Sequence, residues 1–122
     1  MDLSFSKLRA SNVVRCREAY HPLDDWSPTD WACAAAGEMG EACNFVKKLR
    51  RGAQGADRAV LTQQIARELA DTVIYIDLLA ARLQIDLGAA VVEKFNRTSQ
   101  EIKSKVLLCE EPGAVASGGE KP

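Results

Sequence analysis

Histidine, paired cysteines and long apolar runs are scarce in this sequence, and each absence excludes a class of function. His21 is the single histidine among 122 residues, and none of the four cysteines forms a Cys-x-x-Cys pair, so the ligand spacing of a zinc site is missing. We therefore expect reduced cysteines. No apolar run approaches the roughly 20 residues that span a bilayer. The amino-terminal segment has no signal-peptide pattern, so we expect a cytoplasmic protein.

An excess of charge of one sign is also absent. The net charge of −1 gives the protein no general attraction to nucleic acid or to an anionic membrane. One basic cluster stands out, but it is short and contains no interleaved aromatic residue, which argues against a nucleic-acid-binding helical bundle. Its members are Lys47, Lys48, Arg50 and Arg51. We expect neither nucleic acid nor membrane as a partner.

Sustained alternation of apolar and polar residues is missing as well, which favours an all-α chain. Helices are expected over residues 5–20, 28–52, 58–83 and 87–105. The second has the clearest signals: Ser27 as N-cap, Pro28 at the first helical position, Asp30 three residues after the cap, and Gly52 as the stop. Asp86 is expected to cap the fourth helix.

The third predicted helix is apolar nearly all round, and a helix of this kind needs cover on nearly every side. We therefore expect an antiparallel bundle of about four helices, assembled as a dimer or a dimer of dimers. Residues 1–108 would form one domain. Residues 109–122, rich in Gly, Pro and Glu, would form a flexible tail. Asp77 interrupts the apolar run, so we expect it to pair with an arginine or to lie at a subunit interface.

Two acidic pairs have helical spacing. Glu38-x-x-Glu41 lies within the second predicted helix, and Glu68-x-x-Asp71 lies within the third. Residues three apart are neighbours on a helix surface, so each pair presents two carboxylates on one face. Such a pair alone is usually a solvated surface. Here both pairs lie among alanine, glycine and apolar residues, and antiparallel packing of the two helices would bring all four carboxylates together.

A divalent cation relieves the repulsion within such a cluster, because like charges about 4 Å apart repel by about 1 kcal/mol even in water. All the candidate ligands are oxygens, which favours Mg²⁺, with Mn²⁺ as a substitute. The Glu-x-x-His pairs of di-iron bundles are missing, because neither helix contains histidine. We therefore expect Glu38, Glu41, Glu68 and Asp71 to bind one or two Mg²⁺ ions.

This pattern resembles the MazG-like all-α nucleoside triphosphate pyrophosphohydrolases. Their mark is Glu-x-x-Glu followed after a spacer, here 26 residues, by Glu-x-x-Asp, and further similar segments are GEMGEACNFVKKLRRG, ELADTVIYIDLLA and IDLGAAVVEKFN. The resemblance covers residues 26–99. It implies Mg²⁺-dependent hydrolysis of nucleoside triphosphates, dNTPs in particular, to a monophosphate and pyrophosphate in housecleaning of the nucleotide pool. Glu38 and Glu41 would be catalytic, with Glu41 orienting or deprotonating the attacking water.

Five further residues are candidates for binding the substrate. Lys48 follows Glu41 by seven positions on nearly the same face, where it would meet phosphate, although a cation at a helix end is an equally ordinary reading. Tyr75 and Trp31 are expected to lie near sugar or base, with core packing as the alternative. The resemblance implies a phosphate contact for Lys94. Related dCTP pyrophosphatases have a substrate-binding asparagine where this chain has Thr98, and Asn96 is nearby on another face.

Three other functions stay open at this stage. Dimeric dUTPases and phosphoribosyl-ATP pyrophosphohydrolases share the acidic pairs, and a non-catalytic helical protein with a dimerisation or regulatory role would use the same helices for assembly. The short chain and the KFN sequence in the fourth predicted helix favour the MazG-like branch.

Overall fold

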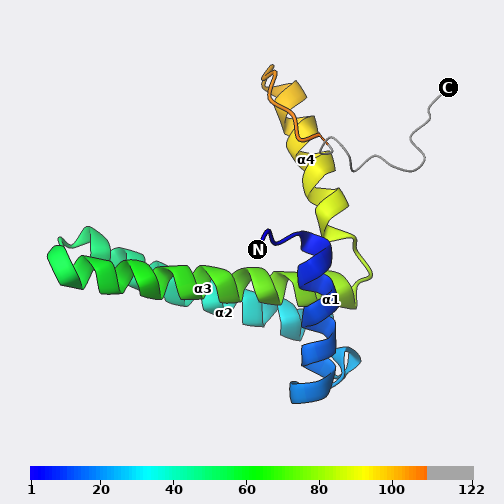
Figure 1. Cartoon of the computed structure of the whole chain (residues 1–122), viewed down its shortest axis with the longest axis horizontal. Coiled ribbons are helices and arrows are strands. Elements are labelled where there is room, and N and C mark those ends of the chain that lie inside the picture. Colours follow the sequence, from blue (N-terminus) through cyan, green and yellow to red (C-terminus); the bar gives the residue numbers. More distant parts are fainter. Residues whose placement is uncertain (110–122) are drawn as a thin grey trace. The chain divides into compact units, whose positions relative to one another are not determined.

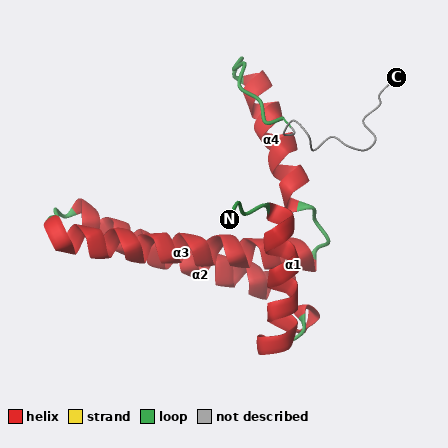
Figure 2. Cartoon of the chain, in the orientation of Figure 1, coloured by secondary structure: helices red, strands yellow, loops and turns green. Residues whose placement is uncertain are grey.

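A computed structural model describes residues 1–109, and every regular element in that range is helical (Figure 2). The prediction of an all-α chain is therefore confirmed for these residues. The order of elements is α1 (Phe5–Arg15), the π-helical turn η1 (Cys16–Tyr20), the 3₁₀ turn η2 (Leu23–Asp25), α2 (Pro28–Arg50), α3 (Gly55–Arg82) and α4 (Leu87–Glu101). None of these helices is both long enough and apolar enough to cross a bilayer.

The ends of α2 are the ones that its sequence predicts. Ser27 Oγ accepts a hydrogen bond from Asp30 N at 3.2 Å, and Asp30 Oδ2 accepts one from Ser27 N at 2.9 Å, which together make a capping box. Pro28 occupies the first turn. After Arg50 the chain passes through Gly52 at φ +107°, a left-handed conformation that glycine adopts without steric cost. The predicted start and stop are both confirmed.

Three other helix boundaries differ from the prediction. The helix expected over residues 5–20 changes to π-helical geometry at Cys16, where His21 N donates to Cys16 O at 2.8 Å and the Cys16 thiol donates to His21 O at 3.2 Å. Helix α3 begins at Gly55, three residues earlier than expected. Helix α4 ends at Glu101 instead of Lys105, because Lys103 turns left-handed at φ +61°.

Helices α2 and α3 form a long antiparallel hairpin, joined by a short turn over residues 51–54 (Figure 1). Two small residues are buried in the middle of α2: Ala35 is 8% exposed and Ala42 is 1% exposed. Small side chains let the two helix backbones approach closely. The hairpin therefore holds residues near the middle of α2 opposite residues near the middle of α3.

Helix α1 packs across α3 near the end of the hairpin and is attached there by polar side chains (Figure 1). Asp77 of α3 is completely buried and accepts a hydrogen bond from Arg9 Nε at 2.9 Å and another from Asn12 Nδ2 at 3.1 Å. Arg9 also donates to Ile85 O at 3.1 Å. The expectation that Asp77 pairs with an arginine is confirmed.

The chain divides into two compact units, Met1–Asp86 and Leu87–Pro122. In the second unit, the Asn96 side chain donates to Leu108 O at 3.0 Å and accepts from Leu108 N at 2.7 Å, which holds the segment after α4. The expected single domain over residues 1–108, the four-helix bundle and its dimer stay predictions. The expected tail lies outside the described residues, apart from Cys109.

Candidate metal centre and adjoining pocket

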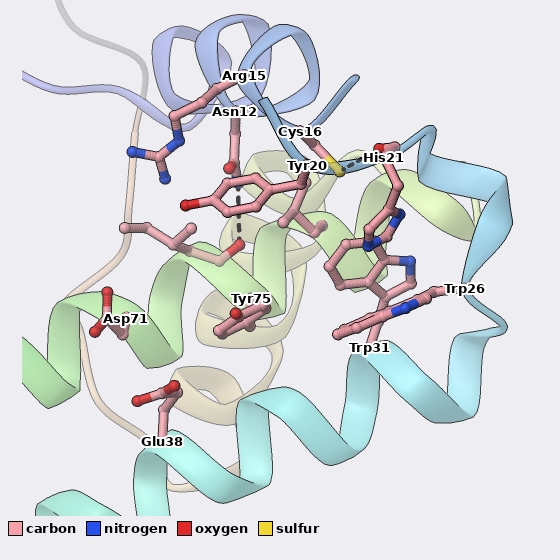
Figure 3. A pocket seen from close by; sticks show the side chains of 12 residues that line it. Asn12, Arg15, Cys16, Tyr20, His21, Trp26, Trp31, Glu38, Asp71 and Tyr75 are labelled. Atoms are coloured by element: carbon pink, nitrogen blue, oxygen red, sulfur yellow. Dashed lines mark hydrogen bonds between the residues drawn. The ribbon is translucent and has the colours of Figure 1, made fainter. Parts of the chain in front are cut away.

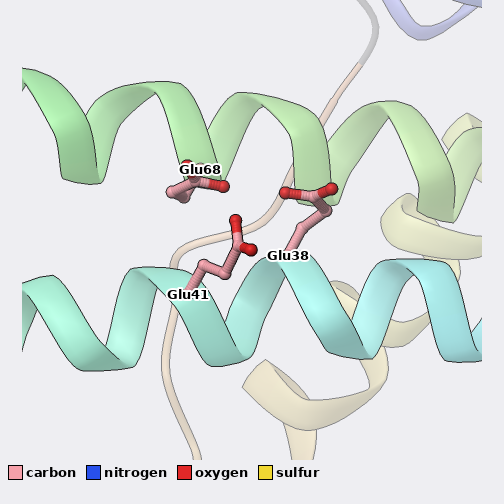
Figure 4. Close-up of side chains that lie close together, drawn as sticks. All are labelled: Glu38, Glu41 and Glu68. Carbon is pink, nitrogen blue, oxygen red and sulfur yellow. The ribbon is translucent and has the colours of Figure 1, made fainter.

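Three glutamates meet between the two arms of the hairpin (Figure 4). Glu38 and Glu41 extend from α2, Glu68 extends from α3, and one carboxylate oxygen of each lies within 4.8 Å of the others. Glu38 and Glu68 are half-buried and Glu41 is exposed. The spacing of three residues in Glu38-x-x-Glu41 puts both side chains on the face of α2 that α3 covers. The structure thus brings together three of the four predicted ligands.

The close approach changes the ionisation of two of these groups. A hydrogen bond with Glu68, followed by repulsion from its charge, raises the pKa of Glu41. A hydrogen bond with Glu38 and partial desolvation raise the pKa of Glu68. These two carboxyls are therefore harder to ionise than a glutamate in water, and a bound cation would relieve this conflict between like charges.

One oxygen of the cluster marks the place where a cation would fit. Glu68 Oε2 is sealed from solvent, and it is the one sealed side-chain oxygen or nitrogen within residues 1–109 that has no hydrogen-bond partner. A buried acceptor with no partner costs free energy. Three carboxylates with one orphaned oxygen among them match the all-oxygen ligand set that Mg²⁺ or Mn²⁺ prefers. The donor set therefore fits a hard divalent cation.

Asp71, the fourth predicted ligand, lies one turn along α3 from Glu68, outside the group of three. Its charge is close enough to raise the pKa of both Glu41 and Glu68. It also lines a pocket together with Glu38. Glu38 thus belongs both to the cluster and to the pocket, and Asp71 adds negative charge at the junction between them.

The pocket has a volume of about 370 Å³ and is formed by α1, η1, α2 and α3 (Figure 3). Glu38 and Asp71 stand at one end, and His21, Trp26 and Trp31 stand at the other. Tyr20 and Tyr75 lie between these two ends. Both tryptophans and both tyrosines of the chain line this one space. A volume of this size matches a small organic ligand.

The aromatic end of the pocket is a packed group of rings. The ring centroid of Trp31 lies 4.5 Å from that of Trp26, 5.5 Å from that of His21 and 6.1 Å from that of Tyr75. Trp31 is only 2% exposed and donates from Nε1 to Leu23 O at 3.2 Å. Trp31 is therefore a core residue that also lines the pocket. Its expected contact with a substrate's sugar or base stays a prediction.

Tyr75 stands where the aromatic and acidic parts of the pocket meet. Burial, followed by the charges of Glu38, Tyr20 and Asp71, raises the pKa of its hydroxyl. The hydroxyl therefore keeps its proton at neutral pH and can donate a hydrogen bond. Arg15, an exposed cation of α1, also lines the pocket and partly offsets this effect on Tyr75.

Lys48 lies away from this pocket. Its Nζ is 5.4 Å from the centroid of the Phe45 ring, and its side chain lines a second, more open cavity of about 530 Å³ together with Arg51, Asp57 and Gln64. This cavity is at the turn end of the hairpin, about two helical turns from Glu41 along α2 and about one turn from Glu68 along α3. The phosphate contact expected of Lys48 stays a prediction, and the position of its side chain gives it no support.

Lys94 and Asn96 belong to α4, in the second unit. Lys94 is exposed. The amide of Asn96 is engaged by the backbone of Leu108 on both its donor and its acceptor side. A substrate contact through that amide would require these two bonds to break. The substrate-binding roles expected of both residues stay predictions.

Sequence reasoning missed the contribution of α1 and of the segment that follows it. Asn12, Arg15, Tyr20 and His21 all line the pocket, yet the residues before Trp26 carry no acidic motif and lie outside the resemblance. One signal was present. Tyr20, His21, Trp26 and Trp31 fall within twelve residues of a chain in which only 6% of residues are Phe, Trp or Tyr. Such a concentration of rings predicts a stacking surface.

No protein-family model, no curated protein and no solved structure matches the chain.

Proposed function

We propose that this protein is a Mg²⁺-dependent nucleoside triphosphate pyrophosphohydrolase that converts dNTPs to a nucleoside monophosphate and pyrophosphate. The proposal depends on one observation: the carboxylate cluster and the aromatic pocket adjoin each other at Glu38. A cluster of carboxylates with an orphaned buried oxygen shares Glu38 with a pocket lined by every tryptophan and tyrosine of the chain. Such a site suits a ligand that is anionic at one end and aromatic at the other.

Glu38, Glu41 and Glu68 would hold the cation, with Asp71 beside them. Mg²⁺ bound there supplies positive charge that offsets the charge of the substrate phosphates as the bond between the α and β phosphates breaks. The carboxylates alone would repel a triphosphate, so the proposal requires the metal. The resemblance of the two acidic motifs to the MazG-like family supports the same reaction.

Glu41 is the residue that we assign to the attacking water. It is the exposed member of the cluster, so its carboxylate is open to solvent while Glu68 is partly covered. Its oxygen would accept a hydrogen bond from the water and then its proton, as the water oxygen forms a bond to phosphorus and pyrophosphate leaves. The proton passes afterwards from Glu41 to solvent.

The aromatic end of the pocket would take the nucleoside. Stacking of a base on an aromatic ring contributes roughly 1–3 kcal/mol and tolerates any base. Trp26, Trp31 and His21 are already packed against each other, so their positions are set before a ligand arrives. The donor hydroxyl of Tyr75 and the cation of Arg15 lie nearer the acidic end, where sugar and phosphate would lie.

We further propose that the enzyme acts as a homodimer or homotetramer. Large apolar side chains of the hairpin are exposed in the single chain: Met39, Val46, Val60, Leu69, Val73 and Ile76. Helical spacing puts Leu69, Val73 and Ile76 on one face of α3, and an apolar face exposed in this way is characteristic of protein interfaces. Packing of a second copy against the hairpin would cover these side chains, and light scattering after size-exclusion chromatography measures the resulting mass.

A pyrophosphate-release assay on a panel of NTPs and dNTPs tests the activity, with Mg²⁺ and with EDTA. We expect turnover only with the metal. Glu41→Gln should lower kcat by at least about a hundredfold, because it removes the charge and the proton acceptor while keeping the volume. The matched control is Glu18→Gln, which removes an exposed carboxylate outside the site and should leave kcat unchanged.

Full activity of Glu41→Gln would contradict the role of this residue. The absence of turnover on every nucleotide would contradict the enzyme assignment. A non-catalytic helical protein is distinguished by thermal unfolding: the enzyme should gain stability from Mg²⁺ with a non-hydrolysable triphosphate, and a scaffold should gain none.

A further inference from the structure

Asn12 of α1 lies between the pocket and a buried polar network that the proposed reaction does not use. It is 4% exposed, and its Nδ2 donates to two acceptors of α3, Ile74 O at 3.0 Å and Asp77 Oδ2 at 3.1 Å. Asp77 in turn accepts from Arg9 Nε at 2.9 Å. Both hydrogens of the Asn12 amide are therefore engaged on the side that faces α3.

The chemistry of these partners determines which way the amide points. A backbone carbonyl can only accept hydrogen bonds, and a carboxylate paired with a guanidinium can only accept as well. If the Asn12 amide were turned over, its oxygen would face two oxygens, one of them charged. The NH₂ group must therefore face Ile74 and Asp77, and Oδ1 must point away from both.

The remaining polar atom of the amide, Oδ1, is the one that is left for a ligand in the pocket. Asn12 is one of the pocket's lining residues, and Figure 3 shows its side chain extending from α1 beside Tyr20. Within residues 1–109, Asn12 Oδ1 accepts no hydrogen bond, and it is not sealed, because the one sealed atom without a partner there is Glu68 Oε2. The aromatic pocket thus contains a fixed, unused hydrogen-bond acceptor.

We propose that Asn12 Oδ1 accepts a hydrogen bond from an exocyclic amino group of the substrate's base, and that Asp77 is the positioning residue that keeps this oxygen turned towards the base. The inference rests on the nucleotide substrate proposed above and adds to it a base class, the amino-bearing bases. The aromatic walls stack any base, whereas a single oriented acceptor distinguishes bases by what they donate.

The protein should bind bases with an amino group more tightly than bases without one, because the latter leave Asn12 Oδ1 buried without a hydrogen-bond donor. A ligand that fills the pocket but lacks the amino group removes water from Asn12 Oδ1 and offers no donor in exchange. A site that hydrogen-bonds one group of its ligand discriminates strongly against a ligand without that group. This discrimination is larger than the discrimination of an apolar site against a ligand that lacks one methylene. We expect the loss of the amino group to weaken binding by at least about fivefold.

The experiment uses pairs of α,β-methylene triphosphates that differ only in the amino group. The pairs are dATP with its purine analogue, dCTP with its pyrimidin-2-one analogue, and dGTP with dITP. Binding to the full-length protein with Mg²⁺ is followed by fluorescence, because Trp26 and Trp31 are the only tryptophans and both line the pocket. In the unmodified protein, the best-bound pair should show the fivefold preference. Equal binding within all three pairs would overturn the proposal.

Two variants test the individual residues. Asn12→Leu keeps the approximate volume and removes the acceptor, so the ratio of the two Kd values within the pair should fall to about one. Asp77→Asn gives position 77 both a donor and an acceptor, which frees the Asn12 amide to turn, and the ratio should fall here too. Ser11→Ala, an exposed neighbour on α1, is the control and should keep the full ratio.

A purely structural role for Asp77 predicts a different result. Loosening of α1 would weaken both members of a pair alike and leave their ratio unchanged, and that outcome would overturn the positioning role. A preserved ratio in Asn12→Leu would overturn the assignment of the acceptor. Tight but indiscriminate nucleotide binding refutes only this inference, whereas the absence of binding by every triphosphate refutes the proposed function as well.

Discussion

Two acidic sites on the same helix show opposite ways of burying a carboxylate. Asp77 is fully buried, and α1 supplies a guanidinium and an amide that satisfy it. Glu68, nine residues earlier on α3, has two more glutamates as neighbours and a buried oxygen with no partner. The chain thus provides a cation where the carboxylate serves the fold. Within residues 1–109 it provides none at Glu68, where we propose that the carboxylate serves a bound metal.

The largest effect is expected from removing the internal cation of the first site. Arg9→Met leaves Asp77 buried without its guanidinium and should lower the free energy of unfolding by about 3–5 kcal/mol. Mg²⁺ should not restore this loss, because one carboxylate with an amide beside it is a poor ligand set. Urea denaturation with and without Mg²⁺ measures both values. A loss below about 1 kcal/mol is typical of solvent-exposed ion pairs. It would show that Asp77 does not depend on its internal cation, and the contrast with Glu68 would then be lost.

A change of the opposite sign is expected at the second site. Glu68→Gln removes one of three repelling carboxylates, so the metal-free protein should unfold at a higher temperature than the unmodified protein. The same change should abolish the gain from Mg²⁺, which for a ligand at one hundred times its Kd is about 2.7 kcal/mol. Differential scanning calorimetry in EDTA and in Mg²⁺ measures both effects.

The control for this comparison is Glu93→Gln, which alters an exposed carboxylate paired with Arg97 on α4. It should change neither melting temperature. If Glu68→Gln lowered the stability of the metal-free protein, the glutamates would be held by contacts other than the ones described, and the proposed cation site would lose its physical basis.

The smallest effect is a pH dependence of stability in the metal-free protein. The pKa values of Glu41 and Glu68 are raised by the hydrogen bonds and charges within the cluster. The folded state therefore binds more protons than the unfolded state between the ordinary and the raised pKa, so the free energy of unfolding falls as pH rises through that window. The penalty is complete above the raised pKa.

Mg²⁺ should reverse this trend, because a bound cation favours the ionised carboxylates and competes with protons. The measurement is urea denaturation from about pH 4 to pH 7, expressed as the difference between the unmodified protein and Glu68→Gln so that other groups cancel. A difference that does not vary with pH in EDTA would show that the glutamates do not interact.

The parts of the structure that were predictable depend on local rules. The start of α2 follows from Ser27, Pro28 and Asp30, three neighbouring residues that satisfy one another's backbone groups. The approach of Glu38, Glu41 and Glu68 follows from spacing along two helices joined by a short turn. The expected start of α3 at Arg58 was wrong by three residues, because helix ends depend on weak competing bonds at the turn.

The pocket was not predictable in the same way. Asn12, Arg15 and Tyr20 line it because α1 crosses α3, and the buried bonds of Asp77 join the two helices at that crossing. Asp77 lies 65 residues from Asn12 along the chain, and no local pattern in a single sequence connects them. The prediction that Asp77 pairs with an arginine was correct, but it did not reveal which arginine or what the pair holds in place.

By itself, the sequence determined the helical class of the described chain, the capped start of α2 and the placement of the acidic pairs on facing sides of a hairpin. These features follow from helical periodicity and from contacts within a few residues. Only the tertiary structure decided that Asp71 stands beside the group of three, that both tryptophans and both tyrosines share one pocket, and that Asn12 of α1 lines that pocket while its Nδ2 bonds α3. Those outcomes depend on how one helix packs across another, which is determined by contacts between residues distant in sequence.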